Sequence, residues 1–383
     1  MAQHFDELET RSQDAREADQ LKILRNMGVE VADLSELRTL PVLRKAELSD
    51  KQKAAPPFGG LTVGDVVHVF QSPGPIYEPG GVTHDWWRFG RFLHAAGVGR
   101  TDIVHNCFGY HLTPAGMMFE NGARAVGARV LPAGTGQTEL QVRAAADIGS
   151  TTYAGTPDYL KSILEKADAL GIALRFDKAC VSGGALFPQL RQVYADRGIA
   201  CLQCYATADL GHIAYESPAM EGMILDEGVI VEIVTPGTGD PVAEGEVGEV
   251  VVTSLNADYP LLRFGTGDMS AFMSGQSPCG RTGKRIKGWM GRADQTTKIK
   301  GMFVRPEQVA ELMQRHSEIS RVRVIAGRDG DSDTMTVRIE APEGGSYEAS
   351  VQEVLKLRGT IEIVAPASLP KDGVLIEDTR SYD

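Results

Sequence analysis

The sequence predicts an α/β protein made of a large domain and a smaller α+β domain. Between residues 67 and 207, apolar strands alternate with glycine-rich loops and with segments whose apolar residues recur at helical spacing. After Gly301 the order becomes helix, strand, strand, helix, strand, which predicts a compact unit of roughly 80 residues. The 383 residues, 42% of them hydrophobic, are enough for both cores. We therefore expect residues 1–293 to form the large domain and residues 294–383 the small one.

The start of the chain predicts helices and then a first strand. Residues 1–57 mix charged helix formers with scattered apolar residues, and we expect a helical lead-in that carries no chemistry. From Val67 an alternating strand ends in the proline- and glycine-rich stretch Gln71–Gly81, for which we expect a loop. The apolar residues of the following segment, His84–Gly97, have helical spacing.

Three further segments complete the large domain. Residues 103–133 predict a strand, a loop, a helix and a second strand. Residues 158–171 predict an amphipathic helix that ends at Gly171. Residues 229–234 and 249–254 predict two strands of an antiparallel hairpin with a long connection.

Composition excludes several classes of partner. The net charge of −12 repels nucleic acid and anionic lipid. The sequence has no run of about 18 apolar residues, and its first 20 residues are polar and acidic, so we expect a cytoplasmic protein without a membrane anchor. Five scattered cysteines do not suggest a disulfide framework. Cys201 and Cys204 form a C-x-x-C, but in the apolar run GIACLQCY we expect them to pack in the core rather than to bind metal.

The stretch Tyr259–Gly301 carries the polar residues that point to a ligand. Asp268 lies at a Gly-Thr-Gly turn, and Arg292 follows in a glycine-bounded connection. A carboxylate presented by a turn can accept two hydrogen bonds from a diol such as a ribose, and an arginine can add donors. The alternative is an ordinary turn with a surface ion pair, which the two residues alone do not exclude.

Together with YATAD at Tyr205–Asp209, this succession resembles the phenylacetate-CoA ligase family of the adenylate-forming ligases. The resemblance extends over nearly the whole chain and is specific from Tyr205 to Gly301. It implies an adenylate-forming fold whose small C-terminal domain is mobile, ATP or AMP, Mg²⁺ and CoA as ligands, and a homodimer. It also implies a small carboxylic acid as substrate.

The resemblance also implies roles for single residues. Glycines let a flat base approach the backbone closely, and the turn Gly184, Ala185 and Leu186 matches the family's adenine contact. The other implied nucleotide and metal contacts are Tyr205 and Ala206 at the base, Thr207 at the α-phosphate, Asp209 at Mg²⁺, and Asp268 with Arg292 at the ribose. The hinge between the domains would be Asp294.

The loop after the strand at residues 103–106 is implied to border the acyl pocket. Phe108, Tyr110 and His111 are the candidates there. Loops at the carboxyl ends of strands are where α/β sheets bind ligands. For His111, a hydrogen-bonded structural role is an equally open alternative.

The sequence departs from the family in its cations and its zinc ligands. In the phosphate loop Ser72 and Gly74 match, but Glu78 stands where the family has a lysine. Val374 stands where we place the C-terminal catalytic lysine, and Lys371 is the nearest ammonium. The family's zinc ligands are replaced by Ser217, Ile224 and Ser277, and only Cys279 remains, so we expect no zinc.

Two functions fit these observations. The first is an ATP-dependent acid–thiol ligase that activates an aromatic or small hydrophobic carboxylic acid as its adenylate and transfers the acyl group to CoA. The alternative is a catalytically impaired homologue that binds nucleotide or acyl-adenylate as an accessory protein. The acidic residue at position 78 and the valine at position 374 motivate the alternative, because each replaces an oriented positive charge.

Overall fold

The chain folds into two compact units, each with its own hydrophobic core. The computed structural model describes residues 5–6, 9–61, 64, 66–184, 186–235, 239–293, 297–300, 302–329, 332–342, 344–366, 368–370 and 375–380. The first unit comprises residues 1–266 and 271–288, and the second comprises residues 267–270 and 289–383. The boundary expected at residue 294 stays a prediction, because residues 294–296 lie outside the described ranges.

A nine-stranded sheet dominates the first unit. Its spatial order is β14 (Phe272–Met273), β15 (Arg285–Ile286), β10 (Met223–Leu225), β9 (Gly211–Glu216), β8 (Ala200–Thr207), β7 (Lys178–Val181), β6 (Thr152–Gly155), β4 (Ile103–Asn106) and β5 (Arg129–Pro132). The strands from β5 to β8 are parallel, and those from β8 to β14 are antiparallel. The parallel half thus meets the antiparallel half at β8.

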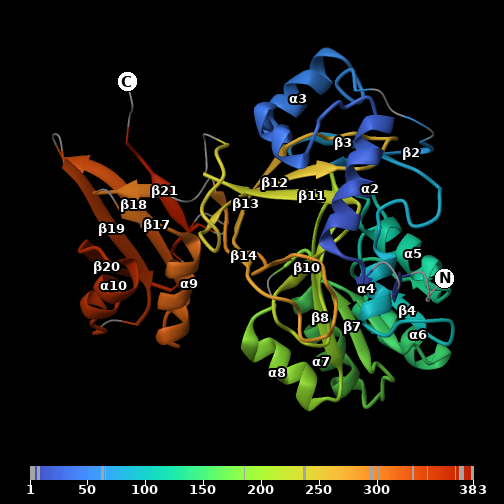
Figure 1. Cartoon of the computed structure of the whole chain (residues 1–383). Coiled ribbons are helices and arrows are strands. Elements are labelled where there is room, and N and C mark those ends of the chain that lie inside the picture. Colours follow the sequence, from blue (N-terminus) through green and yellow to red (C-terminus); the bar gives the residue numbers. More distant parts are fainter. Residues whose placement is uncertain are drawn as a thin grey trace. The chain divides into compact units, whose positions relative to one another are not determined.

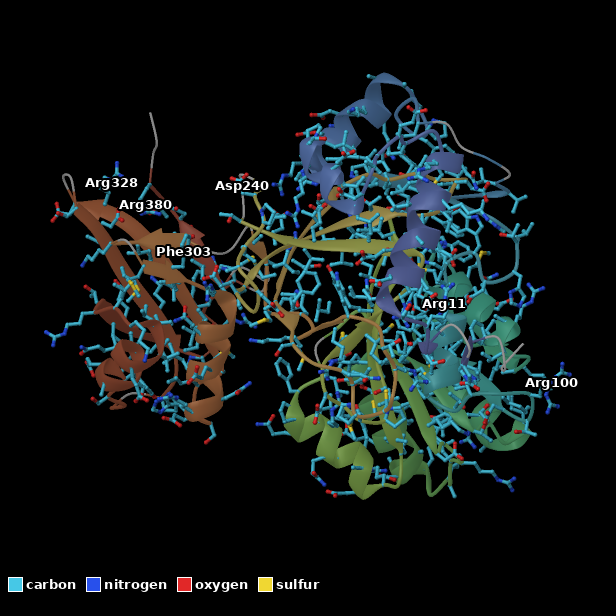
Figure 2. All side chains as sticks on the ribbon, in the orientation of Figure 1. Arg11, Arg100, Asp240, Phe303, Arg328 and Arg380 are labelled. Carbon is cyan, nitrogen blue, oxygen red and sulfur yellow. The ribbon has the colours of Figure 1, made fainter. Side chains whose placement is uncertain are left out.

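Helices cover both faces of the parallel half. Successive residues of a strand point to opposite faces, and here Tyr153 and Ala154 enter different core clusters. One face packs against α4 (Gly90–Ala95) and α5 (Ala115–Ala125), and the other packs against α6 (Thr138–Ile148), α7 (Pro157–Leu170) and α8 (Pro188–Asp196). Figure 2 shows the side chains that fill the space between these layers.

Two local predictions for this half are confirmed. Helix α7 ends at Gly171, whose φ of 65° is left-handed and therefore suits glycine. Cys201 and Cys204 are buried on β8 without a disulfide, and burial raises the pKa of each thiol to about 12. They behave as core residues.

The stretch expected to be a loop at Gln71–Gly81 is instead mostly a β-hairpin. Strands β2 (His68–Ser72) and β3 (Ile76–Gly80) are antiparallel, with Phe70 opposite Glu78. Ile76 and Glu78 are buried and Tyr77 between them is exposed, so the alternation continues past Pro73 and Pro75 as far as Glu78. Proline is tolerated here because the hairpin has only two strands, both of which are edges.

The lead-in forms α2 (Gln13–Asn26), the 3₁₀ helix η1 (Leu34–Thr39), the two-residue strand β1 (Leu43–Arg44) and α3 (Lys45–Ala54). Strand β1 joins a second sheet in the order β1, β13 (Phe264–Ser270), β12 (Gly248–Ser254), β11 (Val229–Val234). The predicted hairpin of residues 229–234 and 249–254 is confirmed as β11 and β12. The lead-in is therefore part of a sheet, which the sequence did not indicate.

One buried arginine attaches the lead-in to this sheet. The Arg263 guanidinium donates to the carbonyl oxygens of Arg38 and Leu40, to that of Gly239, and to the carboxylate of Glu232 at 2.9 Å. Only 2% of Arg263 is exposed. Three carbonyl oxygens from two segments, residues 38–40 and Gly239, thus depend on one side chain.

The second unit has the predicted α+β order. It contains the hairpin β16 (Thr297–Ile299) and β17 (Met302–Val304), then α9 (Pro306–Arg315), β18 (Arg321–Asp329), β19 (Ser332–Glu340), α10 (Glu348–Leu355), β20 (Thr360–Val364) and β21 (Ile376–Asp378). The sheet order is β20, β19, β18, β21, and α9 and α10 pack together beside it (Figure 1). In neither unit is a described helix both long and apolar enough to cross a membrane.

We predict that Arg263→Met lowers the free energy of unfolding of the first unit by about 3 kcal/mol, because Glu232, with 13% of its side chain exposed, would lose its charged partner. Urea unfolding followed by tryptophan fluorescence measures this, since Trp86 and Trp87 are buried in the first unit. The matched control is Arg143→Met, which removes an exposed pair with Glu139 and should change the free energy by less than about 0.5 kcal/mol. Equal effects of the two variants would contradict the prediction.

Candidate active site

The end of β8 and the turn that follows it hold four of the predicted residues. A register shift between Tyr205 and Ala206 bulges the strand, and β8 ends at Thr207. The Thr207 Oγ accepts the backbone N–H of Leu210 at 3.1 Å. Gly211 closes the turn with a φ of 72°, and a Cβ there would lie 3.0 Å from the carbonyl oxygen of Trp87. The turn is therefore fixed by backbone geometry, with the Thr207 hydroxyl proton left to donate elsewhere.

Arg88 stabilises this turn through hydrogen bonds to backbone carbonyl oxygens. Its Nη2 donates to the carbonyl oxygens of Leu210 at 2.6 Å and His212 at 3.0 Å, and its Nε lies 3.4 Å from Asp226 Oδ1. Sequence reasoning missed Arg88, because in the segment His84–Gly97 it has the appearance of an ordinary polar residue beside a helix. Arg88 binds a carbonyl oxygen more than 100 residues later in the chain, and no pattern in the neighbouring sequence indicates such a contact.

The carboxylate of Asp209 is buried and bonded to a lysine from the lead-in. Only 2% of its side chain is exposed, and its Oδ2 lies 3.1 Å from Lys45 Nζ. Asp209 Oδ1 has no hydrogen-bond partner within the described ranges. The first residue of α3 is thus the cation that pairs with the predicted metal ligand. The expectation that the lead-in carries no chemistry stays a prediction.

Glu78 lies in the same buried region. Its side chain accepts a hydrogen bond from the hydroxyl of Ser72, the predicted phosphate-loop serine, and 1% of the residue is exposed. Burial, and then the negative charge of Asp209, raise the pKa of Glu78 to about 8, although Ser72 and Lys45 oppose the shift. Gly74 lies in the turn between β2 and β3.

The adenine and acyl candidates lie at the carboxyl ends of the parallel strands β7 and β4, which are separated in the sheet by β6. Gly184 is exposed and Leu186 is buried in the connection after β7, where the Ser182 hydroxyl donates to the carbonyl oxygen of Cys204 at 3.0 Å. Gly183 comes close to Phe108, since a Cβ there would lie 3.8 Å from Phe108 Cε1. The turn predicted to contact adenine therefore lies beside the loop that follows β4.

In that loop the three acyl candidates differ in exposure. Phe108 is buried and stacks on Phe119 with ring centroids 4.3 Å apart. The Tyr110 hydroxyl accepts from Asn106 Nδ2 at 2.8 Å, and burial raises the pKa of Tyr110. His111 is exposed.

The predicted ribose residues belong to the second unit. Asp268 Oδ1 accepts from Arg292 Nη1 at 3.2 Å and from Trp289 Nε1 at 3.1 Å. Gly267 is left-handed, with a φ of 73°, and a Cβ there would lie 2.8 Å from Arg292 Nη2. The glycine before Asp268 therefore leaves the space that the guanidinium occupies.

Curated proteins similar to this chain cover most of its length. A phenylacetate-coenzyme A ligase of Thermus thermophilus is 30% identical over 341 residues, which cover 84% of this chain and 76% of that protein. The chain belongs to the phenylacetate-coenzyme A ligase family. A second member, from Escherichia coli, is 30% identical over 359 residues, covering 86% and 79%. Among models of protein families, none matches the sequence. The predicted enzyme class, an AMP-forming acid–CoA ligase, is that of this family.

Solved structures confirm the adenylate-forming ligase fold. A 2-hydroxyisobutyryl-CoA ligase in the postadenylation state superposes with a TM-score of 0.78 at 22% identity, covering 97% of this chain and 91% of that one. An amide bond synthetase from Marinactinospora thermotolerans has a TM-score of 0.58 at 18% identity, covering 81% and 67%.

The family's zinc positions hold a polar cluster in this member. The Ser277 hydroxyl lies 3.1 Å from Cys279 Sγ. Burial raises the pKa of Cys279, but hydrogen bonds with Ser217, Ser277 and Arg281 outweigh it and lower the pKa to about 7. Within the described ranges, no group of three or more His, Cys, Asp or Glu residues is arranged to hold a metal. The absence of zinc stays a prediction.

Three predicted residues lie outside the described ranges. They are Ala185 of the adenine turn, the hinge residue Asp294 and the C-terminal Lys371, and Val374 is outside them as well. Their roles stay predictions.

We predict that the first unit loses stability as the pH rises from 5 to 8 in the presence of a chelator. Glu78 keeps its proton in the folded state up to a pKa of about 8 but loses it near 4.5 when unfolded, so the folded state binds more protons in this window. The contribution of this one group to the slope is at most about 1.4 kcal/mol per pH unit.

Urea unfolding at several pH values measures this slope in wild type and in Glu78→Gln, which keeps the polar contact with Ser72 but cannot ionise. The variant should lose the contribution of Glu78. An unchanged slope would show that Glu78 titrates as an ordinary exposed glutamate.

Proposed function

We propose that the protein activates an aromatic or small hydrophobic carboxylic acid with ATP and then forms its CoA thioester. An oxygen of the acid would attack the α-phosphorus of ATP and displace pyrophosphate. The CoA thiol would then attack the acyl carbonyl and release AMP. The observation that carries the proposal is membership of the phenylacetate-coenzyme A ligase family over most of the chain, with the turn after β8 retained.

Thr207 and Asp209 would act at the α-phosphate. The Thr207 oxygen already accepts a backbone N–H, so its proton is available to a phosphate oxygen. Asp209 fits an oxygen-seeking cation, because its Oδ1 is buried and has no partner in the described part of the chain. Mg²⁺, when bound, would neutralise phosphate charge. Thr207 would then stabilise the charge that develops on the attacked phosphate.

The remaining residues would position the nucleotide and the acid. Asp268 with Arg292 would hold the ribose, since a carboxylate and a guanidinium match a diol. The other contacts we propose are Gly184, Ala185, Leu186, Tyr205 and Ala206 at adenine, Ser72 and Gly74 at the outer phosphates, Phe108, Tyr110 and His111 at the acid, and Lys371 and Asp294 as catalytic lysine and hinge.

The relatives suggest the class of acid and the cellular setting. The CoA ligases named above act on phenylacetate and 2-hydroxyisobutyrate, by their names. We propose an acid in this range of size, CoA as acceptor, a homodimer and a cytoplasmic location, with neither nucleic acid nor membrane as a partner.

The rival proposal is a homologue that binds nucleotide or acyl-adenylate without turnover. The observation in its favour is Glu78, a buried carboxyl near Asp209 at the position of the family's lysine. Loss of one oriented charge in a transition state commonly lowers the rate by about a hundredfold to a thousandfold.

The first test is acid-dependent exchange of pyrophosphate into ATP over a panel of aryl and short acyl acids with Mg²⁺. We expect exchange with at least one acid, and about a hundredfold loss in Thr207→Val, because the phosphate-facing hydroxyl is removed. Thr207→Ser keeps the hydroxyl and should recover most of the rate. Calorimetric binding of AMP by folded protein, with no exchange across the panel, would favour the rival.

A second test addresses the ribose residues. Gly267→Ala should weaken AMP binding about tenfold, or about 1.4 kcal/mol, because the new Cβ would displace the Arg292 guanidinium. Gly136→Ala is the control, since Gly136 has a similar φ of 76° but no atom within 4 Å of the added Cβ. Isothermal titration with AMP compares the two. Unchanged affinity in Gly267→Ala would exclude Arg292 from the nucleotide site.

A further inference from the structure

A cavity of about 510 Å³ lies in the first unit between α2, residues 84–91 and residues 226–228. Five basic side chains line it together with four carboxylates, and the basic ones are Arg11, Arg16, Lys22, Arg88 and Arg91. The wall therefore has more basic than acidic groups, although the net charge of the chain is −12. None of the described residues in this wall is among those proposed to bind the nucleotide, the metal or the acid.

Glu227 binds three of the guanidinium groups. Its Oε1 accepts from Arg16 Nε at 2.8 Å, and its Oε2 lies 3.4 Å from Arg91 Nη2. The same Oε2 accepts from Arg11 Nη2, and Arg11 also pairs with Asp19. Three guanidinium groups thus share two carboxylates, and one positive charge remains at this end of the cavity.

Arg88 packs against the residues on either side of Glu227. Its Nε lies 3.4 Å from Asp226 Oδ1, and a Cβ at Gly228 would lie 2.3 Å from Arg88 Cδ. Its Nη2 is occupied by the carbonyl oxygens of Leu210 and His212 in the turn after β8. The guanidinium that holds this turn therefore also lines the cavity.

The wall offers hydrogen-bond donors that lack acceptors. In the part of the chain that the structure describes, Arg11 Nε and Arg88 Nε are buried without a hydrogen-bond partner, and Lys22 forms neither a hydrogen bond nor an ion pair. The buried carboxylate oxygens of the wall do have partners there; Asp85, for example, accepts the Gly90 N–H at 3.0 Å. A buried donor without an acceptor is unfavourable, so the cavity favours a ligand with negatively charged acceptors.

We propose that this cavity binds a small anion that carries phosphate groups, such as phosphate or pyrophosphate, through Lys22 and the Nε atoms of Arg11 and Arg88. Guanidinium and ammonium groups are the usual protein partners of phosphate oxygens. The volume lies within the range of about 300–1,000 Å³ that is typical of small-molecule sites. The site is additional to the proposed nucleotide site, and its occupation does not depend on ligase activity.

The test is isothermal titration of the full chain, free of metal, with pyrophosphate and, in a second arm, with inorganic phosphate. We expect one site per chain that remains when AMP is saturating. Lys22→Gln should weaken binding about fivefold, because it removes one charged donor. Asp19→Asn should tighten binding about threefold, because this carboxylate, 55% exposed, competes with the anion for Arg11. Tighter binding of pyrophosphate than of phosphate would identify a ligand with two phosphate groups, and equal binding a ligand with one.

The matched control is Arg25→Gln, which removes a positive charge from α2 outside the cavity and should leave the affinity unchanged. Lys22, Asp19 and Arg25 are all exposed, so we expect each variant to fold. The proposal is overturned if wild type binds neither anion up to millimolar concentrations, if Lys22→Gln binds as Arg25→Gln does, or if AMP displaces all of the bound pyrophosphate.

Pyrophosphate exchange separates this inference from the proposed function. Anion binding that depends on Lys22, without exchange over the panel of acids, sinks only the ligase activity. Exchange without binding that depends on Lys22 sinks only the anion site.

Discussion

The buried carboxylate of Asp209 is the constraint on which the arrangement around β8 depends. A charged group with 2% of its side chain exposed requires a nearby positive charge. The parallel half of the sheet ends at β8, so the turn after it lies where ligands of α/β sheets bind. The cation comes from Lys45, 164 residues earlier in the chain.

The positive charge that Asp209 requires explains why the position of the lead-in matters. The ammonium of Lys45 can reach Asp209 only if α3 is held in place, and two sets of hydrogen bonds do this. Arg263 binds the carbonyl oxygens just before β1, and Gln52 binds the backbone of β3. Both side chains bind backbone atoms, so the position of α3 depends little on which side chains surround it. Arg88 does the same for the turn itself. The site is thus built by arginine and glutamine side chains that bind main-chain oxygens from distant segments.

These long-range bonds also explain what the sequence could and could not predict. Helix α7, the β11–β12 hairpin and the order of the second unit follow from local periodicity and turn residues, and they were predicted. The motif YATAD and Asp268 were found because a ligand-binding turn carries its chemistry in adjacent residues. Lys45, Arg88 and Arg263 were missed, because each acts on a partner more than 100 residues away and none stands in a distinctive local pattern. The strand β3 was missed because two prolines hid an alternation that burial makes plain.

The replacement of a lysine by Glu78 changes the electrostatics of the site rather than deleting one contact. With glutamate there, the region holds two carboxyls, and the one ammonium reaches only one oxygen of Asp209. A second carboxyl at this depth is unfavourable unless it binds a proton or a cation. Burial and the charge of Asp209 raise the pKa of Glu78, so Glu78 can hold a proton, but this proton leaves Asp209 Oδ1 without a partner among the described residues.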